Sequence, residues 1–97
     1  MIDLEFMVEH TKGITKEEFS KDLVLLDSVM FRFIQISEHI KKLSKEFKDR
    51  HIEIPWVSIV GLRNRIVHEY DNVDLDIVYD TVRKDIYTIH SLFESLK

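Results

Sequence analysis

The stretch RNRIVHEY, residues 63–70, brings together side chains that are suited to work on a phosphate group. Arg63 stands five residues before His68, and Tyr70 follows two residues after the histidine. Histidine can exchange a proton near neutral pH because its unperturbed pKa is about 6.5, and arginine offers a planar fork of donors to phosphate oxygens. The same spacing is also common in ordinary helices, where the arginine is solvated and the histidine merely hydrogen-bonded. Spacing alone therefore leaves both interpretations open.

The segment that carries Arg63 is predicted to be a helix from Pro55 to about His68, because proline is favoured in a first helical turn. Projection at about 100° per residue places Arg63 in the middle of an apolar sector. An arginine in such a place is costly unless its charge is matched or used, so the position brings the functional interpretation nearer to even with the ordinary one. The apolar residues of that sector are Trp56, Ile59, Val60, Ile66 and Val67.

The opposite side of the same predicted helix carries Gly61, Asn64 and His68. Arg63 and His68 then point about 140° apart, so one regular helix cannot easily aim both at one atom. Either the helix ends early and turns His68 inward, or two copies of the chain meet across a two-fold axis. Gly61 costs about 1 kcal/mol relative to alanine inside a helix, and it predicts the close approach of another backbone.

Helix start and stop signals organise the rest of the chain. A first helix, Ile2–Lys12, is predicted to end at Gly13, which suits the left-handed position after a helix. Thr15 and Glu18 have the spacing of a capping box, which predicts that another helix begins there. Asp74 is predicted to cap the final helix.

A long helix is predicted between about Asp22 and about Lys48, because apolar residues recur there at steps of three and four. Additional apolar residues widen its face and predict contact on two sides, with the bundle and with something else. The sum is an all-α fold, an antiparallel bundle of four to five helices in a single domain, residues 1–97. The residues that widen the face are Leu23, Leu25, Phe31 and Ile34.

Composition limits the classes of protein that fit. The chain has no cysteine, two glycines and one proline, which favours helices and rules out disulfides and thiolate chemistry. No apolar run is long enough to span a membrane, so a cytoplasmic location is expected. The five histidines form no pair at helical spacing, so neither a metal site nor a cofactor is expected. The net charge of −4 argues mildly against nucleic-acid binding, yet the run KKLSKEFKDR, residues 41–50, is locally basic.

The segment EIPWVSIVGLRNRIVHEYDNVDLDIVYD resembles the HEPN domains of the HepT-like toxins, which come from prokaryotic toxin–antitoxin pairs. That family is marked by an arginine, a polar residue, three more residues, a histidine, any residue and a tyrosine. Here these positions are Arg63, Asn64, His68 and Tyr70, with none missing. TKGITKEEF near the start of the chain also resembles the family, so the resemblance covers nearly the whole chain.

The resemblance implies metal-independent cleavage of RNA by a homodimer that pools two motifs, with Arg63 acting on the phosphate and His68 moving protons. Asn64 would orient His68 or hold a phosphate oxygen, and Arg65 is a weaker candidate for contacts to the RNA backbone. The resemblance further implies that a partner nucleotidyltransferase, the antitoxin, silences the toxin by attaching AMP to Tyr70. The alternative is a helical dimer that binds nucleotide or a partner protein and cleaves nothing.

Overall fold

A computed structural model describes residues 2–96, and every element in that range is helical. The predicted all-α fold is confirmed. A 3₁₀ turn, η1 (Tyr70–Asn72), and a π-helical turn, η2 (Val82–Ile86), complete the order of elements. The α-helices are α1 (Ile2–Thr11), α2 (Lys16–Lys21), α3 (Leu23–Lys41), α4 (Lys45–Arg50), α5 (Trp56–His68), α6 (Leu75–Thr81) and α7 (Tyr87–Ser95).

The first helix boundaries lie where the local signals predict them. Gly13 adopts a positive φ of 75° after α1, a conformation that glycine reaches without steric cost. The Thr15 side chain accepts a hydrogen bond from the Glu18 backbone N–H, and the Glu18 carboxylate accepts one from the Thr15 N–H, both at 3.1 Å. Asp22 caps α3 by accepting a hydrogen bond from the Leu25 N–H. These contacts satisfy amide groups that a helix start leaves without partners.

The prediction of one helix from Asp22 to Lys48 is wrong, because α3 ends at Lys41 and a separate helix, α4, begins at Lys45. Ser44 between them caps α4, and its hydroxyl accepts a hydrogen bond from the Phe47 N–H at 3.1 Å. Serine is favoured at such a start because its hydroxyl replaces a missing backbone acceptor. Apolar periodicity continues through the break, so periodicity by itself did not reveal it.

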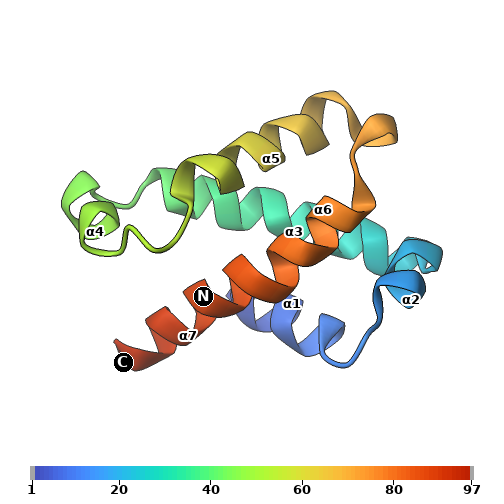
Figure 1. Cartoon of the computed structure of the whole chain (residues 1–97), viewed down its shortest axis with the longest axis horizontal. Coiled ribbons are helices and arrows are strands. Elements are labelled where there is room, and N and C mark those ends of the chain that lie inside the picture. The colour runs from blue at the N-terminus through green and yellow to red at the C-terminus, as the bar shows by residue number, and fades with distance from the viewer. Residues whose placement is uncertain (1, 97) are drawn as a thin grey trace.

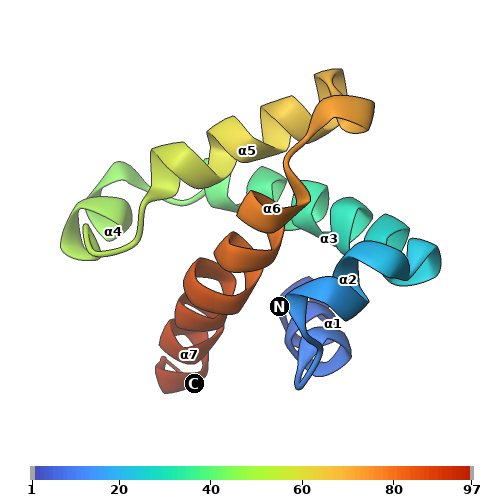
Figure 2. The ribbon, with the colours of Figure 1, turned by 45° about the vertical axis from the view of Figure 1, so that its right-hand side comes forward.

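The final helix begins at the predicted cap, Asp74, and contains one irregular turn. Helices α6 and α7 are joined by the π-helical turn η2, so they form one continuous rod (Figure 1). This rod lies beside α1, and α5 lies alongside α3 (Figures 1 and 2). Helix α3 therefore has α1 on one side and α5 on the other.

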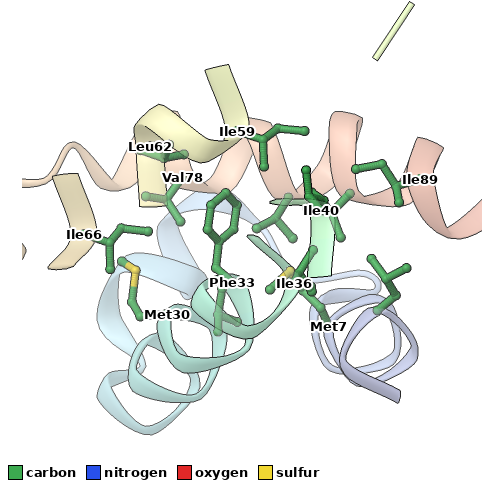
Figure 3. Close-up of a cluster of buried hydrophobic side chains, with 14 of the residues drawn as sticks. Met7, Met30, Phe33, Ile36, Ile40, Ile59, Leu62, Ile66, Val78 and Ile89 are labelled. Atoms are coloured by element: carbon green, nitrogen blue, oxygen red, sulfur yellow. The ribbon is translucent and has the colours of Figure 1, made fainter. Parts of the chain in front are cut away.

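One apolar core joins these helices, and the inner face of α3 supplies much of it. Phe33 is fully buried among side chains of α5 and α6, including Leu62 and Val78, while Met7 of α1 packs near Ile36 (Figure 3). The inner face of α3 consists of Leu26, Val29, Met30, Phe33, Ile36 and Ile40. Because these side chains are packed by neighbours from both sides, α3 is the fixed frame against which α5 is placed.

Candidate functional site

His68 is the last residue of α5, near the C-terminal end of its helix as predicted. The helix does not end early, and the imidazole is exposed to solvent. Within residues 2–96 it has no hydrogen bond or ion pair with another side chain. The chain then turns at Glu69, whose N–H donates to the Arg65 carbonyl at 2.7 Å. An exposed imidazole at a helix end is free to reach a proton on a bound molecule.

Arg63 is half-buried and its guanidinium is held within the chain. One terminal nitrogen, Nη2, lies 2.9 Å from Glu38 Oε1 on α3, and Nη1 donates to Asn64 Oδ1 at 3.0 Å. Its Nε is buried without a hydrogen-bond partner among residues 2–96. The charge of Arg63 is therefore matched by Glu38, a residue that the sequence pattern did not single out.

The position of Arg63 on α5 differs from the predicted one. The buried face of α5 contains Leu62 and excludes Val67, which is 44% exposed, so Arg63 lies at the edge of that face and not at its centre. The edge lets the aliphatic stem pack while the guanidinium reaches α3. The buried residues of α5 are Trp56, Ile59, Leu62 and Ile66.

Tyr70 lies in η1, just after α5, and its hydroxyl also contacts α3. The hydroxyl donates a hydrogen bond to Asp27 Oδ1 at 2.5 Å. This hydrogen bond, with smaller contributions from burial and from the charges of Asp27 and Asp71, raises the pKa of Tyr70 above its ordinary value of 10.0. The hydroxyl therefore keeps its proton, and remains a donor to Asp27, throughout the neutral pH range.

Two carboxylates of α3 thus hold the two ends of the motif. Asp27 and Glu38 are eleven residues apart, about three helical turns, so they share one face of the helix. Phe31, which is exposed, and Ile34, which packs against the edge of the core, lie between them on that face, which is called the outer face of α3 here. Both acids could have been noticed in the sequence, because they are acidic residues that interrupt the unusually wide apolar face of this helix.

The remaining predicted residues lie on the exposed side of α5. The amide oxygen of Asn64 bonds to Arg63 and not to His68, and Arg65 is exposed without a side-chain partner within residues 2–96. Gly61 has nothing within 4 Å of the position that a Cβ would take. The predicted approach of another backbone is therefore not made by this chain, and the expectation is wrong for a single copy.

A group with metal-binding chemistry lies on other helices. Glu5 of α1 and His90 and Glu94 of α7 have ligand atoms within 4.8 Å of one another. The spacing of the histidines does not reveal this group, because it contains a single histidine and because Glu5 joins it only through the packing of α1 on α7. The group is not part of the motif, whose residues lie on α5 and η1.

Apolar side chains are also exposed next to the motif. Leu23, Val24 and Phe31 on α3 are 73%, 78% and 57% exposed, and Val67 on α5 is partly exposed. Phe31 lies between Asp27 and Glu38 on α3. Val67 lies between Arg63 and Tyr70, the residues that those two carboxylates contact. Within residues 2–96, no helix has the length and apolar character that crossing a membrane requires.

Comparison with known proteins places the chain in a family. The family model described as "Ribonuclease HepT-like" matches residues 3–96. The protein "Putative RNase TTE0752" of Caldanaerobacter subterraneus subsp. tengcongensis is 39% identical over 84 residues, which cover 87% of this chain and 75% of that protein. The protein "Probable ribonuclease HepT" of Thermococcus cleftensis is 32% identical over 94 residues, 97% of this chain and 86% of that protein. No solved structure matches.

Proposed function

The chain belongs to the HepT-like ribonuclease family, and from this premise we propose that it is a metal-independent endoribonuclease. The observation that carries the proposal is the state of the motif. Arg63 is held in place by Glu38 at 2.9 Å, while His68, five residues on, is exposed and unbonded within residues 2–96. A fixed cation and a free imidazole can supply charge stabilisation and proton transfer, the two requirements for cleaving a phosphodiester without a metal.

In the proposed reaction the ribose 2′-oxygen attacks the adjacent phosphorus. A base removes the 2′-hydroxyl proton as the new O2′–P bond forms, and an acid gives a proton to the leaving O5′ as the P–O5′ bond breaks. The products are a 2′,3′-cyclic phosphate and a 5′-hydroxyl end. Arg63 stabilises the charge on the pentacoordinate phosphorus, and Asn64 supports the arginine or a phosphate oxygen. The reaction needs two proton-transfer groups, and each chain offers one motif histidine.

A homodimer would supply the second histidine. Arg63 and His68 diverge by about 140° on α5, so one copy does not direct both at one phosphate. Exposed apolar residues on the outer face of α3 and on Val67 give a second copy a surface to cover. Light scattering is expected to give twice the mass of one chain at micromolar concentration, and a monomer would contradict the pooled site.

We further propose that the chain is the toxin of a toxin–antitoxin module, acts in the cytoplasm, and is silenced when a partner nucleotidyltransferase attaches AMP to Tyr70. Tyr70 is an exposed residue and follows His68 by two positions, in the short turn η1. The added phosphate would carry a negative charge next to Asp27, which now accepts the hydroxyl proton. Repulsion between the two negative charges would displace the tyrosine, and the added AMP would then occupy the place of the substrate phosphate.

The alternative is a dimeric helical module that binds nucleotide or a partner protein without cleaving RNA. The deciding experiment incubates the pure protein with total RNA, with and without the substitution His68→Ala. We expect cleavage by the wild type and a loss of about 10²–10⁴-fold in the variant, because a positioned proton carrier contributes that much. His68 is exposed, so the variant should stay folded. Equal cleavage by both proteins, or cleavage by neither, would favour the binding module.

A further inference from the structure

A cavity of about 420 Å³ opens on the Asn64 side of α5. Its lining includes Asn64 and Gly61 of α5 and two lysines, Lys41 and Lys48. Its remaining wall is apolar and comes from α3 and α5: Ile40, Trp56, Val57 and Val60. The lining of the cavity thus contains both a residue hydrogen-bonded to Arg63 and two cations.

The break between α3 and α4 shapes this cavity. Because α3 stops at Lys41, α4 can fold back against the start of α5, where Trp56 holds it. The indole Nε1 of Trp56 donates to the carbonyls of Lys48 at 3.2 Å and His51 at 3.1 Å. The backbone of Lys48 is therefore fixed at the rim by a side chain that also forms the wall.

The two lysines at the rim are weakly neutralised. Lys48 has no ion pair with a carboxylate in residues 2–96. The carboxylate near Lys41 is Glu38, at 3.7 Å, and Glu38 lies closer to Arg63, at 2.9 Å. Lys45, in the same basic run, is by contrast paired to Asp49 at 2.8 Å. Lys48 and, to a lesser degree, Lys41 are therefore available to an anion in the cavity.

We propose that this cavity is a subsite for one nucleotide of single-stranded RNA, next to the phosphate that is cleaved. The base lies on the apolar wall, and a flanking phosphate contacts Lys48 and Lys41. The proposal rests on the proposed ribonuclease function and adds the part of the substrate that the motif does not bind. A cavity of this size is within the range of small-ligand sites, and unpaired bases bind to apolar and aromatic side chains.

Two features favour RNA over a second copy of the chain as the occupant. A two-fold axis at the cavity would place Lys48 near its own counterpart, and like charges across an interface repel. RNA carries the opposite charge and releases counterions when lysines bind its phosphates. Gly61 has no side chain, and the space that a side chain would take there is open and can be occupied by a base.

Trp56 is the single tryptophan of the chain and lines the cavity, so its fluorescence can report occupancy. The probe is a uridine hexanucleotide with 2′-O-methyl groups, which cannot be cleaved because the attacking hydroxyl is blocked. We expect saturable quenching that weakens with salt. In Lys48→Gln the plot of log affinity against log salt should be shallower by about 0.7, the value for one phosphate contact on a single strand.

Two further variants make the test specific. Val57 lines the cavity and is 87% exposed, so Val57→Glu should fold normally. Its carboxylate should repel the phosphates of the probe and lower the affinity for the probe at least tenfold. Lys42→Gln removes the same charge from the same basic run, but Lys42 does not line the cavity, so binding should match the wild type. On total RNA, Lys48→Gln should raise KM and leave kcat unchanged, because the residue binds substrate away from the reacting atoms.

The outcomes separate this inference from the proposed function. If the wild type cleaves RNA while Lys48→Gln and Val57→Glu bind the probe normally, the subsite is wrong and the ribonuclease stands. If Val57→Glu instead splits a dimer into monomers in light scattering, the cavity is an interface between copies and the inference is overturned. If the wild type cleaves nothing, yet quenching occurs and is weakened by Lys48→Gln, the binding site stands without the enzyme.

Discussion

The two faces of α3 differ in what they contribute. The inner face is a continuous row of aliphatic and aromatic side chains, all at most 6% exposed. The outer face mixes exposed apolar residues such as Phe31 with two carboxylates, Asp27 and Glu38, that contact the motif. The inner face holds the fold together, and the outer face positions chemical groups. One helix thus serves stability on one side and the proposed function on the other.

The difference has a consequence for substitutions. Core positions tolerate exchanges that conserve volume, because packing there depends on shape. A carboxylate that contacts an arginine must place an acceptor within hydrogen-bond distance, so removing that acceptor matters more than a change of volume. Stability and activity should therefore respond separately to variants on the two faces, and the following experiments test that separation.

The largest effect is expected on the inner face. Phe33→Ala removes a fully buried ring and should lower the free energy of unfolding by about 3–5 kcal/mol. Denaturant unfolding measures the loss, and RNA cleavage per folded molecule should remain close to that of the wild type. If the folded fraction of the variant is inactive, the inner face also shapes the site and the comparison between faces fails.

Arg63→Ala changes a residue of α5 that contacts the outer face of α3. This variant should lose activity and keep most of its stability, the opposite of Phe33→Ala. Loss of a preorganised cation typically lowers kcat by about 10²–10³. Stability should change little, because the variant also relieves the buried Nε that lacks a partner. Cleavage of total RNA and thermal unfolding are measured together, with Arg65→Ala as the control from the exposed side of the same helix. Equal activity of the two variants would remove Arg63 from the mechanism.

Glu38 sharpens the comparison, because it acts through Arg63 and not on the substrate. Glu38→Ala should lower kcat roughly tenfold or more, since a hydrogen bond to a charged group contributes about 1.5–3 kcal/mol. Glu38→Gln keeps an acceptor at the same place and should restore most of kcat. The readout is the split between kcat and KM for both variants. Equal losses in alanine and glutamine variants would mean that the charge of Glu38, and not its position, is what counts.

Tyr70→Phe should have the smallest effect on cleavage and stability. The ring remains, and the lost hydrogen bond to Asp27 is partly exposed, so less than about 1 kcal/mol of stability is expected to disappear. Because the folded pKa of Tyr70 is raised, the contribution is complete below pH 10 and is lost only as pH rises through the raised value. The stability difference between the two proteins should therefore be constant from pH 7 to 9.

The same variant tests the proposed switch. Tyr70→Phe lacks the oxygen that would receive AMP. A cell that produces the partner nucleotidyltransferase should therefore not be protected from the toxicity of this variant. Mass spectrometry of the wild type isolated with the partner should show one added AMP, and the variant should show none. Modification of the variant would place the AMP on another residue and leave only the cleavage proposal.

Local signals predicted the helix starts because each is decided by a few neighbouring residues. Thr15 with Glu18, and Asp74, cap helices in the structure as predicted, and Asp22, the expected start of the long helix, caps α3. The break before α4 was missed because Leu43 and Phe47 continue the apolar period across it. The break there is fixed by the Ser44 cap and by the indole of Trp56 in the next helix, α5.

The motif could be found from sequence, but its partners could not. Arg63, His68 and Tyr70 are recognised by their spacing, and the structure places them around the end of α5. Glu38 and Asp27 precede their partners by 25 and 43 residues, and only the packing of α5 on α3 brings them close. Their roles, like those of the motif residues, stay predictions until the variants are measured.

The spacing of Asp27 and Glu38 makes this part of α3 intolerant of changes in length. Insertion or deletion of one residue between them would rotate one carboxylate by about 100° relative to the other. Either Arg63 or Tyr70 would then lose its partner, and the buried row on the opposite face would be turned out of the core as well. The segments 42–44 and 51–55 hold no residue that bonds to Arg63 or Tyr70. Natural variation in chain length is therefore expected to be more frequent there than within residues 27–38.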